Sequence, residues 1–535
     1  MKKINTLLVK SPNFRALRRL FFSIIIYSKS YKIEHSSPSS YFGKKILFAS
    51  FIGGNATIVG FESFLSDLYK SYGHQTEFLL CDRILPLCFE CNYLNKVDLK
   101  VPVNNSSDNF CKGCTLSGKI NLAGKNNILY LSKYVDKFEI DSFTSAIKDL
   151  DILGMCSFTH GSINLGEHAK AATLRFLAKS QIQDNSYEKE VLRNFLISSF
   201  ITKIAFEKII EVSRPDVVFT IHGLYVPHGV VAEICRKMKI KVVVWNLGYR
   251  KNTFIFSLND TYHRTLLKTR NDLWETMEWN TEKEVITKEY LLSRRIGNQD
   301  WISFSHKSNY EEEIEIEEFC KLYSKNNIAA LLTNVGWDAQ IHYDQNIFLD
   351  MHDWLKTTID WFAIRPNKAL IIRVHPAEIT SVYPSKEKTH EILNSIYPKL
   401  PRNVKILSSS NKIDTYFVCS KANVILIYGT KMGVELAPLE KKIIVAGEAW
   451  IKNKGLTWDP KNKSEYLNLL ENFDELKLPE SYSVEKALKY AYFFFMKQYR
   501  FIGGIKKFIS PGCIVIDQSS RIDEEQLVYL LSLIR

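Results

Sequence analysis

The chain has 535 residues, of which 46% are hydrophobic and 24% are charged, as expected for a globular protein with more than one domain. Its net charge of +13 favours phosphate-rich or anionic partners, such as nucleotides, anionic lipids and acidic glycans. Nucleic acid is disfavoured, because the sequence contains no zinc-finger repeat, RNP-like motif or regular basic helix. No apolar run is long enough to span a bilayer, so we expect no transmembrane helix.

The first 43 residues are basic and apolar, and their first acidic residue is Glu34. They contain the apolar run Leu20–Tyr27. A signal peptide is disfavoured, because this run is short and is followed by basic and bulky residues. We expect residues 1–43 to form an amphipathic extension that rests on an anionic inner membrane surface, as in a peripheral membrane protein. A helix packed on the first domain is the alternative.

The ten cysteines do not follow the pattern of a secreted disulfide framework, so a reducing cytoplasm is the expected location. Two Cys-x₂-Cys pairs lie within a predicted insertion at residues 81–114. Their members are Cys88, Cys91, Cys111 and Cys114. This spacing predicts a structural zinc site that four thiolates would close. The alternatives are an iron–sulfur cluster, with Cys81 as a further ligand, and a group of buried free cysteines.

Residues 44–320 are predicted to form a first α/β domain. An apolar strand within 44–52 runs into Gly53-Gly54, and an amphipathic helix follows. The loop is not Gly-x-Gly-x-x-Gly, so nothing supports a dinucleotide site here. Two later strands, within 215–228 and 240–251, end in polar and aromatic residues that we expect at one rim of the sheet, where such groups hold sugars. The predicted rim residues are His222, Tyr225, His228, Trp245, Asn246, Tyr249 and Arg250.

Residues 327–485 alternate apolar strands with helices, as a doubly wound parallel domain does. The strands begin near Ile328, Ala369, Val404, Val424 and Lys442. An acidic run at 311–318 reads as a solvated helix before this domain. Residues 486–535 are predicted to add two further helices, at 490–501 and 523–534. The predicted fold class is therefore α/β with two Rossmann-like, doubly wound domains.

Two loops of the second domain carry the chemistry of an anion site. They follow the strands that begin at Ala369 and Val424, and a ligand in an open α/β sheet lies beyond such strand ends. The residues they offer are Arg373, His375, Glu378, Gly429, Thr430, Lys431 and Glu435. A glycine lets the backbone approach phosphate, and a helix start attracts it, while Glu435 suits a ribose. The alternative is that Gly429 only makes a turn and that Arg373 pairs with a surface acid.

The same loops resemble the capsule polysaccharide biosynthesis family. The resemblance rests on Arg-Val-His-Pro-Ala-Glu at 373–378, Tyr-Gly-Thr-Lys-Met-Gly-Val-Glu-Leu-Ala at 428–437, and the segments Ile443–Gly447 and Lys454–Asp459. It covers most of residues 44–490. The family consists of GT-B-type glycosyltransferases and includes bacterial Kdo transferases. The His-Pro pair also resembles the one with which bacterial sialyltransferases meet the donor phosphate.

The resemblance implies a GT-B-like fold, with the two domains facing a cleft, and a bacterial, cytoplasmic glycosyltransferase that needs no metal ion for catalysis. The donor would be a nucleotide sugar, with CMP-Kdo plausible and UDP, GDP and dTDP sugars open. The acceptor would be a surface glycan or lipid-linked glycan of the capsule or lipopolysaccharide type. Because the first loop of GT-B enzymes faces the cleft, Asn55 joins the candidate acceptor residues.

Transfer to an acceptor hydroxyl requires a base, and three residues are candidates for it: His222, Asp338 and Glu167. Two other functions stay open. One is a non-catalytic glycan-binding or assembly protein of polysaccharide export, which the intact His-Pro and Gly-Thr-Lys segments disfavour. The other is a nucleotide-sugar epimerase, which shares the two-domain architecture and would need paired carboxylates at one sugar.

Overall fold

The computed structural model describes residues 43–535 apart from Phe89, Asn126, Gly504 and the segments 91–106, 301–307, 339–345, 382–383, 507–514 and 517–521. The basic extension predicted for residues 1–43 and the cysteine ligand Cys91 therefore lie outside the described residues. Within the described part of the chain, no helix has both the length and the apolar character needed to cross a membrane.

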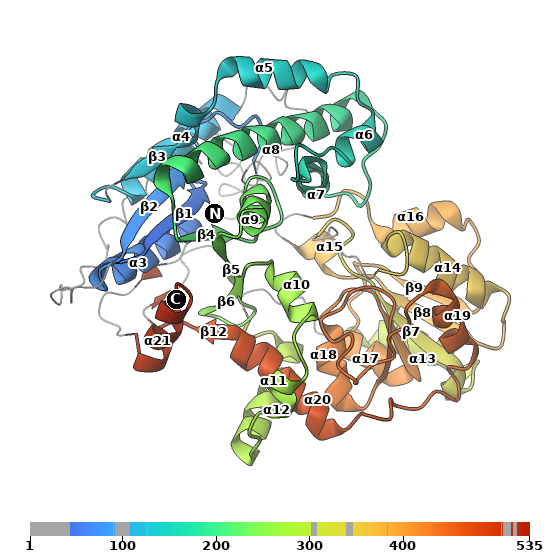
Figure 1. Ribbon diagram of the computed structural model, residues 1–535. Helices are drawn as coiled ribbons and strands as arrows, with labels where there is room; N and C mark the ends of the chain where they lie inside the picture. The colour runs from blue at the N-terminus through green and yellow to red at the C-terminus, as the bar shows by residue number, and fades with distance from the viewer. Residues whose placement is uncertain are drawn as a thin grey trace, which may run out of the picture.

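The first domain is built on a seven-stranded sheet, which lies at the upper left in Figure 1. Its strands, in spatial order, are β12 (Tyr499–Phe501), β6 (Thr253–Leu258), β5 (Lys241–Leu247), β4 (Val217–Ile221), β1 (Lys45–Phe51), β2 (Gln75–Leu80) and β3 (Ile128–Tyr130). Strands β1 to β5 are parallel, β6 pairs antiparallel with β5, and β12 pairs antiparallel with β6. The parallel strands are continuous apolar runs because helices cover both faces of the sheet.

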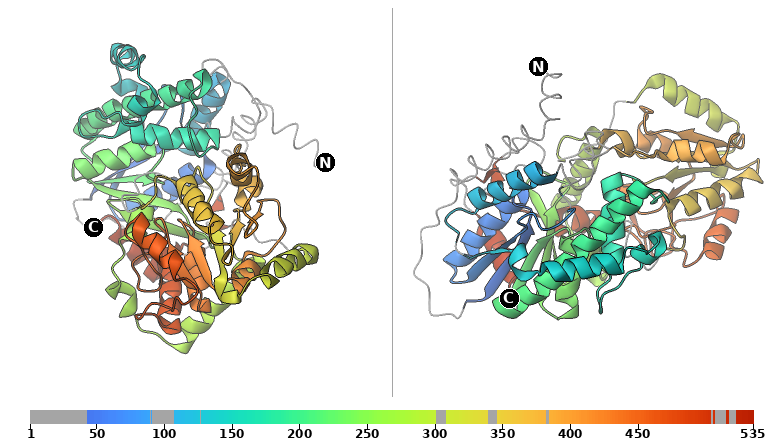
Figure 2. Two further views of the ribbon diagram at one scale, coloured as in Figure 1. Left: turned by 90° about the vertical axis from the view of Figure 1, so that its right-hand side faces the viewer. Right: turned by 90° about the horizontal axis from the view of Figure 1, so that it is seen from above.

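Helices cover this sheet on both sides (Figures 1 and 2). They are α3 (Ala56–Ser71), α4 (Ser107–Asn121), η2 (Leu131–Tyr134), α5 (Lys137–Ala146), α6 (Ile152–Cys156), α7 (Leu165–Leu177), α8 (Ser186–Ser213) and α9 (His228–Lys237). The predicted strand–loop–helix start is present, since β1 runs through Gly53 and Gly54 into α3. Asn55 caps α3, accepting a hydrogen bond from the Ile58 N–H at 3.2 Å.

The second domain is built on a five-stranded, fully parallel sheet, at the lower right in Figure 1. Its strands, in spatial order, are β11 (Lys442–Val445), β10 (Val424–Ile427), β7 (Ile328–Leu332), β8 (Ala369–Arg373) and β9 (Val404–Leu407). Alternate residues enter two separate cores, Ala330 and Leu332 on one face and Ala329 and Leu331 on the other. This period of two is that of a strand buried on both faces. The predicted doubly wound parallel domain is thus confirmed.

The helices of the second domain pack on these two faces. They are η3 (Lys325–Asn327), α14 (Met351–Ala363), α15 (Ala377–Thr380), α16 (Thr389–Ile396), α17 (Thr415–Lys421), α18 (Met432–Leu436), η4 (Ala437–Leu439) and α19 (Lys463–Glu471). Helix α14 fills one core with Trp354, and α17 fills the other with Val418. The predicted acidic helix is α13 (Tyr310–Lys321), in which Ile316 alone is buried.

A third group of elements lies beside the two sheets, and part of it joins the two domains. It comprises α10 (Tyr262–Leu267), α11 (Asp272–Glu275), α12 (Thr281–Ile296), α20 (Val484–Tyr492), η5 (Phe493–Gln498) and α21 (Glu524–Ser532), with the small hairpin of β13 (Ile505–Lys506) and β14 (Val515–Ile516). Ile255 of β6 and Tyr499 of β12 share one hydrophobic core with the α20 side of the second sheet. The two sheets are therefore connected by continuous apolar packing.

The helix predicted at 490–501 is only partly correct. Helix α20 ends at Tyr492, a wide π-helical turn follows, and Tyr499–Phe501 form strand β12 of the first sheet. In this strand Tyr499 pairs with Ile255 and Phe501 with Thr253. An aromatic run fits either state locally, and pairing with the open edge of β6 decides it. The chain thereby returns from the second domain to the first.

The first core contains a buried carboxyl group. Glu62 of α3 is fully buried, and the Trp245 indole N–H donates to its Oε1 at 2.9 Å while the Ser50 hydroxyl donates to Oε2. Burial raises the pKa of Glu62 to about 8, against the lowering effect of these two hydrogen bonds. At neutral pH the group is therefore mostly protonated, as a neutral part of the core.

Replacement of Glu62 by glutamine tests this interior. The folded-state pKa of Glu62 is raised from 4.5 to about 8. The contribution of its proton to the stability of the wild type is therefore complete below pH 4.5 and is lost as the pH rises through about 8. Glu62→Gln has no such proton, so its stability relative to wild type should grow by up to about 4 kcal/mol between about pH 5 and about pH 8.5. Urea unfolding measures this difference, with the exposed Glu211→Gln as control. A pH-independent difference would contradict the buried state.

Candidate functional site

The Gly429–Lys431 loop follows β10, as predicted, and is held by the loop after β7. The Gly429 N–H donates to Asn334 Oδ1 at 3.2 Å, and a Cβ atom on Gly429 would lie 2.7 Å from Asn334 Nδ2. A side chain at this position would therefore require Asn334 to move. The Met432 N–H, at the start of α18, donates to Thr430 Oγ1 at 3.2 Å. Helix α18 has five residues, and its dipole is correspondingly small.

The positive charge of this loop comes from Lys431. Its ammonium nitrogen lies 3.9 Å from the ring centroid of Tyr249, which follows β5 of the first domain. Desolvation, and next the Arg294 cation, lower the pKa of Lys431 to about 7, against the opposing effect of Glu435 and Asp300. The side chain is thus close to half protonated at neutral pH. An anion placed beside it would favour the charged form.

His375 lies after β8, in the predicted His-Pro loop. Its backbone N–H donates to Thr333 Oγ1 at 3.0 Å, and its Nδ1 accepts the Ala377 N–H at 3.0 Å. A neutral ring with Nδ1 as acceptor carries its proton on Nε2, which is then a hydrogen-bond donor. Desolvation, followed by Lys431 and Arg373, lowers the pKa of His375 to about 4. At neutral pH the residue is therefore an uncharged donor.

Two other predicted donor residues hold neighbouring loops. Arg373 is buried, and its Nη1 and Nη2 donate to the carbonyls of Ser408 and Asn411 at 2.8 and 3.1 Å. Glu378 is also buried, and its Oε1 accepts the Thr389 N–H at 3.2 Å and the Thr389 hydroxyl at 2.5 Å. These bonds commit both side chains to the scaffold of the second domain. The predicted phosphate contact is not part of them.

Glu435 is part of a buried ionic network. Its Oε1 lies 3.0 Å from Arg294 Nε, the Tyr416 hydroxyl donates to Oε2, and Arg294 also pairs with Asp300. Burial alone would raise the pKa of Glu435, but the Arg294 and Lys431 cations outweigh it and lower the pKa. The network ties α12 to α18. The ribose contact predicted for Glu435 stays a prediction.

On the first-domain side, His222 follows β4 with a positive φ of 64°. This left-handed conformation is uncommon for a residue other than glycine. The ring centre lies 4.9 Å from that of Tyr225 and 5.8 Å from that of His263. Desolvation, and next the cation of Arg175, lower the pKa of His222 well below its usual value. The imidazole is therefore neutral and a weak proton acceptor at pH 7.

Asp338, in the loop after β7, reaches the first domain. Its Oδ1 accepts the Tyr225 hydroxyl at 2.9 Å and lies 3.0 Å from Arg175 Nη1. The Asp338 side chain is 53% exposed, whereas that of Arg175 is 14% exposed. Arg175 was not predicted, although the signal is present: it is the one charged residue in the run Ala171–Ala178. The predicted residues Asp338 and Tyr225 are thus brought together.

A second contact between the domains is aromatic. Trp450, after β11, lies 5.9 Å from His263 and 6.3 Å from both Tyr262 and Tyr249, measured between ring centres. Trp450 was not selected from the sequence, whereas the segment that contains Tyr262 and His263 was expected to extend the first-domain rim. We call the convergent group the interdomain site. Its members are His222, Tyr225, Tyr249, Tyr262, His263, Asp338, His375, Lys431 and Trp450.

Three of the residues predicted for acceptor binding make contacts that support the fold. Trp245 is fully buried and bonds Glu62, and His228 is buried with Nε2 3.3 Å from the Ser50 carbonyl. Arg250 donates to the carbonyls of Phe495 and Tyr499, both at 3.1 Å.

The remaining three predicted residues lie at the edge of this arrangement. Asn55 caps α3 and donates to Glu90 at 3.2 Å, and Asn246 Nδ2 donates to the Tyr262 hydroxyl at 3.3 Å. Asn246 therefore adjoins the interdomain site. Glu167 lies in the first turn of α7, about 12 Å of helix from Arg175. An acid in a first helical turn is favourable without any catalytic role.

The predicted zinc site is not assembled by the part of the chain that the structure describes. Cys111 and Cys114 lie on α4, and Cys114 Sγ accepts the Gly54 N–H at 3.1 Å. Among the described residues, no group of three or more His, Cys, Asp or Glu side chains could hold a metal ion. Cys88, Cys111 and Cys114 are all in this set, so the three do not gather. The fourth predicted ligand, Cys91, lies outside it.

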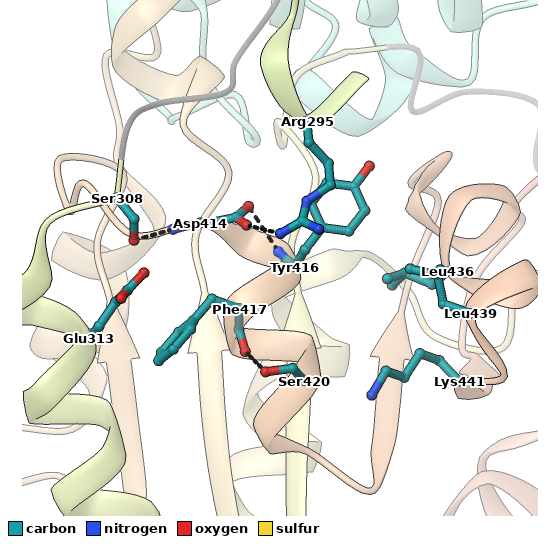
Figure 3. Close-up of a pocket in the computed structure, with 10 residues that line it drawn as sticks. All are labelled: Arg295, Ser308, Glu313, Asp414, Tyr416, Phe417, Ser420, Leu436, Leu439 and Lys441. Carbon is teal, nitrogen blue, oxygen red and sulfur yellow. Dashed lines mark hydrogen bonds and ion pairs between the residues drawn. The ribbon is translucent and has the colours of Figure 1, made fainter. Parts of the chain in front are cut away.

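Figure 3 shows a separate cavity of about 480 Å³ beside α17 and α18. Arg295 and Lys441 line it, but Arg295 Nη2 is 3.0 Å from Asp414 Oδ2, so one of its cations is already paired. Tyr416 separates the cavity from Glu435, to which its hydroxyl donates. The cavity therefore borders the buried Arg294–Glu435 network through Tyr416, and no member of the interdomain site lines it.

The fold resembles solved structures at low sequence identity. The beta Kdo 2,4 transferase KpsC of Thermosulfurimonas dismutans matches 60% of this chain and 88% of its own, with 15% identity and a TM-score of 0.35. The Neisseria meningitidis UDP-GlcNAc 2-epimerase bound to UDP-GlcNAc matches 83% and 97%, with 10% identity and a TM-score of 0.24. The spinosyn rhamnosyltransferase SpnG matches 85% and 95%, with 7% identity and a TM-score of 0.23.

The chain is thus similar to glycosyltransferases, among them a Kdo transferase, and to an epimerase. No protein-family model matches the chain, and no curated protein matches it. Because the structural similarity is distant, we infer the function below from the chemistry of the interdomain site.

The buried pair Arg294–Glu435 gives a stability prediction. Replacing Arg294 by methionine leaves Glu435 and Asp300 buried without their cation, which should lower the free energy of unfolding by about 3–5 kcal/mol. The neighbouring Arg295→Met is the matched control, because Arg295 is 49% exposed in its pair with Asp414 and should cost at most about 1 kcal/mol. Urea unfolding compares them, and equal losses would contradict the buried network.

Proposed function

We propose that the protein is a glycosyltransferase that binds a nucleotide-sugar donor on the second domain and a glycan acceptor on the first. The observation that carries the proposal is the meeting of the anion loop with the first-domain rim. Lys431 lies against Tyr249, and Asp338 bonds Tyr225. A donor phosphate at Lys431 would therefore have its sugar beside the rim residues, which is the arrangement that transfer requires.

The donor phosphate would be held by groups of different kinds. Lys431 supplies the positive charge and His375 an uncharged Nε2–H. As the bond between the anomeric carbon and the phosphate oxygen breaks, negative charge grows on that oxygen. A cation and a donor fixed in place stabilise this charge, which is often the largest catalytic contribution. On this account the leaving group needs no metal ion.

Asp338 is the base that we propose among the three candidates. His222 is a weak proton acceptor because its pKa is well below the usual value, and Glu167 lies at the far end of α7. The acceptor hydroxyl oxygen would bond to the anomeric carbon, its proton would pass to the Asp338 carboxylate, and the nucleotide would leave with the electron pair. The aromatic side chains of Tyr249, Tyr262 and Trp450 would pack against sugar faces.

The finer assignment follows the family resemblance. We propose a surface glycan of the capsule or lipopolysaccharide type as acceptor, with CMP-Kdo as one plausible donor beside UDP, GDP and dTDP sugars. A location at the inner membrane surface would depend on residues 1–43. A structural zinc would require Cys91 to join cysteines that are apart among the described residues.

Nucleotide binding tests the proposal. We expect one of CMP, UDP, GDP, dTDP and ADP to raise the melting temperature of the full-length protein, because a ligand that binds only the folded state stabilises it. Lys431→Met and His375→Ala should each weaken that nucleotide about 10- to 100-fold, the value of a charge-assisted hydrogen bond. Lys441→Met, in the cavity of Figure 3, is the matched control and should bind normally.

Product analysis then separates the candidate functions. With the matching nucleotide sugar, a transferase releases free nucleotide and does so faster with a glycan acceptor. An epimerase instead forms an isomeric nucleotide sugar without acceptor. Binding of glycans without any affinity for nucleotides would contradict the proposal and favour the assembly protein.

The pH dependence of binding reports on Lys431 itself. Its free pKa is about 7, and a bound phosphate holds it protonated, so binding takes up a proton above that pH. Between about pH 7.5 and pH 9.5, where the phosphate is fully ionised, the dissociation constant should rise by up to about tenfold per pH unit. Titration calorimetry measures the slope. Lys431→Arg, which keeps its charge, should flatten it, and an equal slope in both proteins would refute the assignment.

A further inference from the structure

Arg175 is a cation placed between the two domains. It lies in the last turn of α7, in a helix whose other residues from Ala171 to Leu177 are uncharged. Burying most of an arginine side chain costs free energy unless its charge is paired. The groups that pair with Arg175 therefore indicate its role.

The guanidinium of Arg175 joins three segments of the chain. Its Nη1 lies 3.0 Å from Asp338 Oδ1 and donates to the Tyr225 hydroxyl at 3.3 Å. Its carbon lies 4.6 Å from the ring centre of Tyr225 and 5.7 Å from that of Trp337. Tyr225 in turn donates to the same Oδ1 of Asp338 at 2.9 Å. Two donors from the first domain thus fix one carboxylate oxygen of the second.

The chain around this contact fixes the arginine in turn. Leu174 and Ala178 pack with Trp337 in a small core shared by the two domains. The Lys386 N–H donates to the Ala178 carbonyl at 3.0 Å, and Trp337 Nε1 donates to the Ser385 hydroxyl at 2.9 Å. The backbone that carries Arg175 is therefore anchored to the loop that carries Asp338. A carboxylate so held has little freedom to leave its place.

We propose that Arg175 is a positioning residue, which holds the Asp338 carboxylate oriented between the two domains as the proton acceptor of transfer. The inference rests on the proposed glycosyltransferase function and adds to it a residue that does not touch the substrate. The charge of Arg175 also opposes protonation of His222.

Other titratable groups also face Asp338. Among the described residues they are Tyr225, Tyr249, Tyr262 and His263 of α10, and His375 of the second domain. Both histidines have a pKa near 4 and the tyrosines with resolved shifts are raised, so these groups stay neutral around pH 7. Arg175, in contrast, carries a permanent charge.

A double-mutant cycle of Arg175→Gln and Asp338→Asn tests the inference in the full-length protein. The readouts are kcat and KM for release of nucleotide from the donor sugar, and the dissociation constant of the free nucleotide. Arg175→Lys keeps the charge but loses the two-pronged fork. Arg270→Gln is the control, because Arg270 pairs with Asp272 on the exposed side of α11.

We expect Arg175→Gln to lower kcat about 10- to 100-fold, the cost of a misplaced reacting group, with nucleotide affinity within about twofold of wild type. In the Asp338→Asn background the same change should cost nothing further, because residues that act as a unit are not additive. Arg175→Lys should recover part of kcat.

Two outcomes would overturn the inference. They are additive losses in the double mutant, and a loss confined to KM or to nucleotide affinity. The second would make Arg175 an ordinary structural contact between the domains. Nucleotide binding in Arg175→Gln shows that the variant is folded. If the wild type neither binds nor turns over any nucleotide sugar, the proposed function itself fails. This result is distinguishable from a failure of the double-mutant cycle, which requires an active wild type.

Discussion

Parallel strands place all of their carboxyl ends at one edge of a sheet, and in this protein two such edges meet. The meeting is visible in three contacts: Asp338 after β7 with Tyr225 after β4, Lys431 after β10 with Tyr249 after β5, and Trp450 after β11 with His263. None of these residues is a neighbour of its partner in sequence. The chemistry of the site depends on the geometry that brings the two edges together.

The electrostatics of the site divide it into permanent and variable charges. Arg175, Arg294 and Glu435 are held in ion pairs, so their charges are fixed by the fold. Lys431 is different, because desolvation and the nearby Arg294 bring its pKa to about 7. His375 and His263 stay neutral at that pH because burial lowers their pKa values to about 4. A lysine that can gain or lose its proton, beside neutral hydrogen-bond donors, suits an anion that binds and dissociates.

Much of the fold could be predicted because its strands are uninterrupted apolar runs. The segments Ile328–Leu332 and Val424–Ile427 have no polar residue, and a glycine follows each within a few residues, Gly336 and Gly429. That pattern belongs to buried parallel strands whatever surrounds them. Strand β12 was missed because Tyr499–Phe501 becomes a strand only through pairing with β6, which lies some 240 residues earlier. The local sequence pattern of a segment does not show which distant strand it will pair with.

The site was predictable in part, for a related reason. Position in a loop after a strand identified His375, Lys431, Asp338 and Tyr225, but it could not tell which way a side chain turns. Arg373 and Glu378 have the residue types of a phosphate and sugar site, yet their bonds go to carbonyls and to Thr389. Trp245 has the aromatic face of a sugar site and is buried against Glu62.

Arg175 and Trp450 show the opposite failure. Each stands in a helix or loop without any motif and gains its role only from the other domain. Long-range contacts of this kind are set by tertiary packing, which single-sequence patterns do not encode.

The most direct test of the account is a crystal structure of the protein with the nucleotide that stabilises it. The account predicts a terminal phosphate within about 3 Å of Lys431 Nζ and His375 Nε2, with the sugar side open toward Asp338 and Tyr249. A phosphate bound elsewhere, such as in the cavity beside Tyr416, would contradict it.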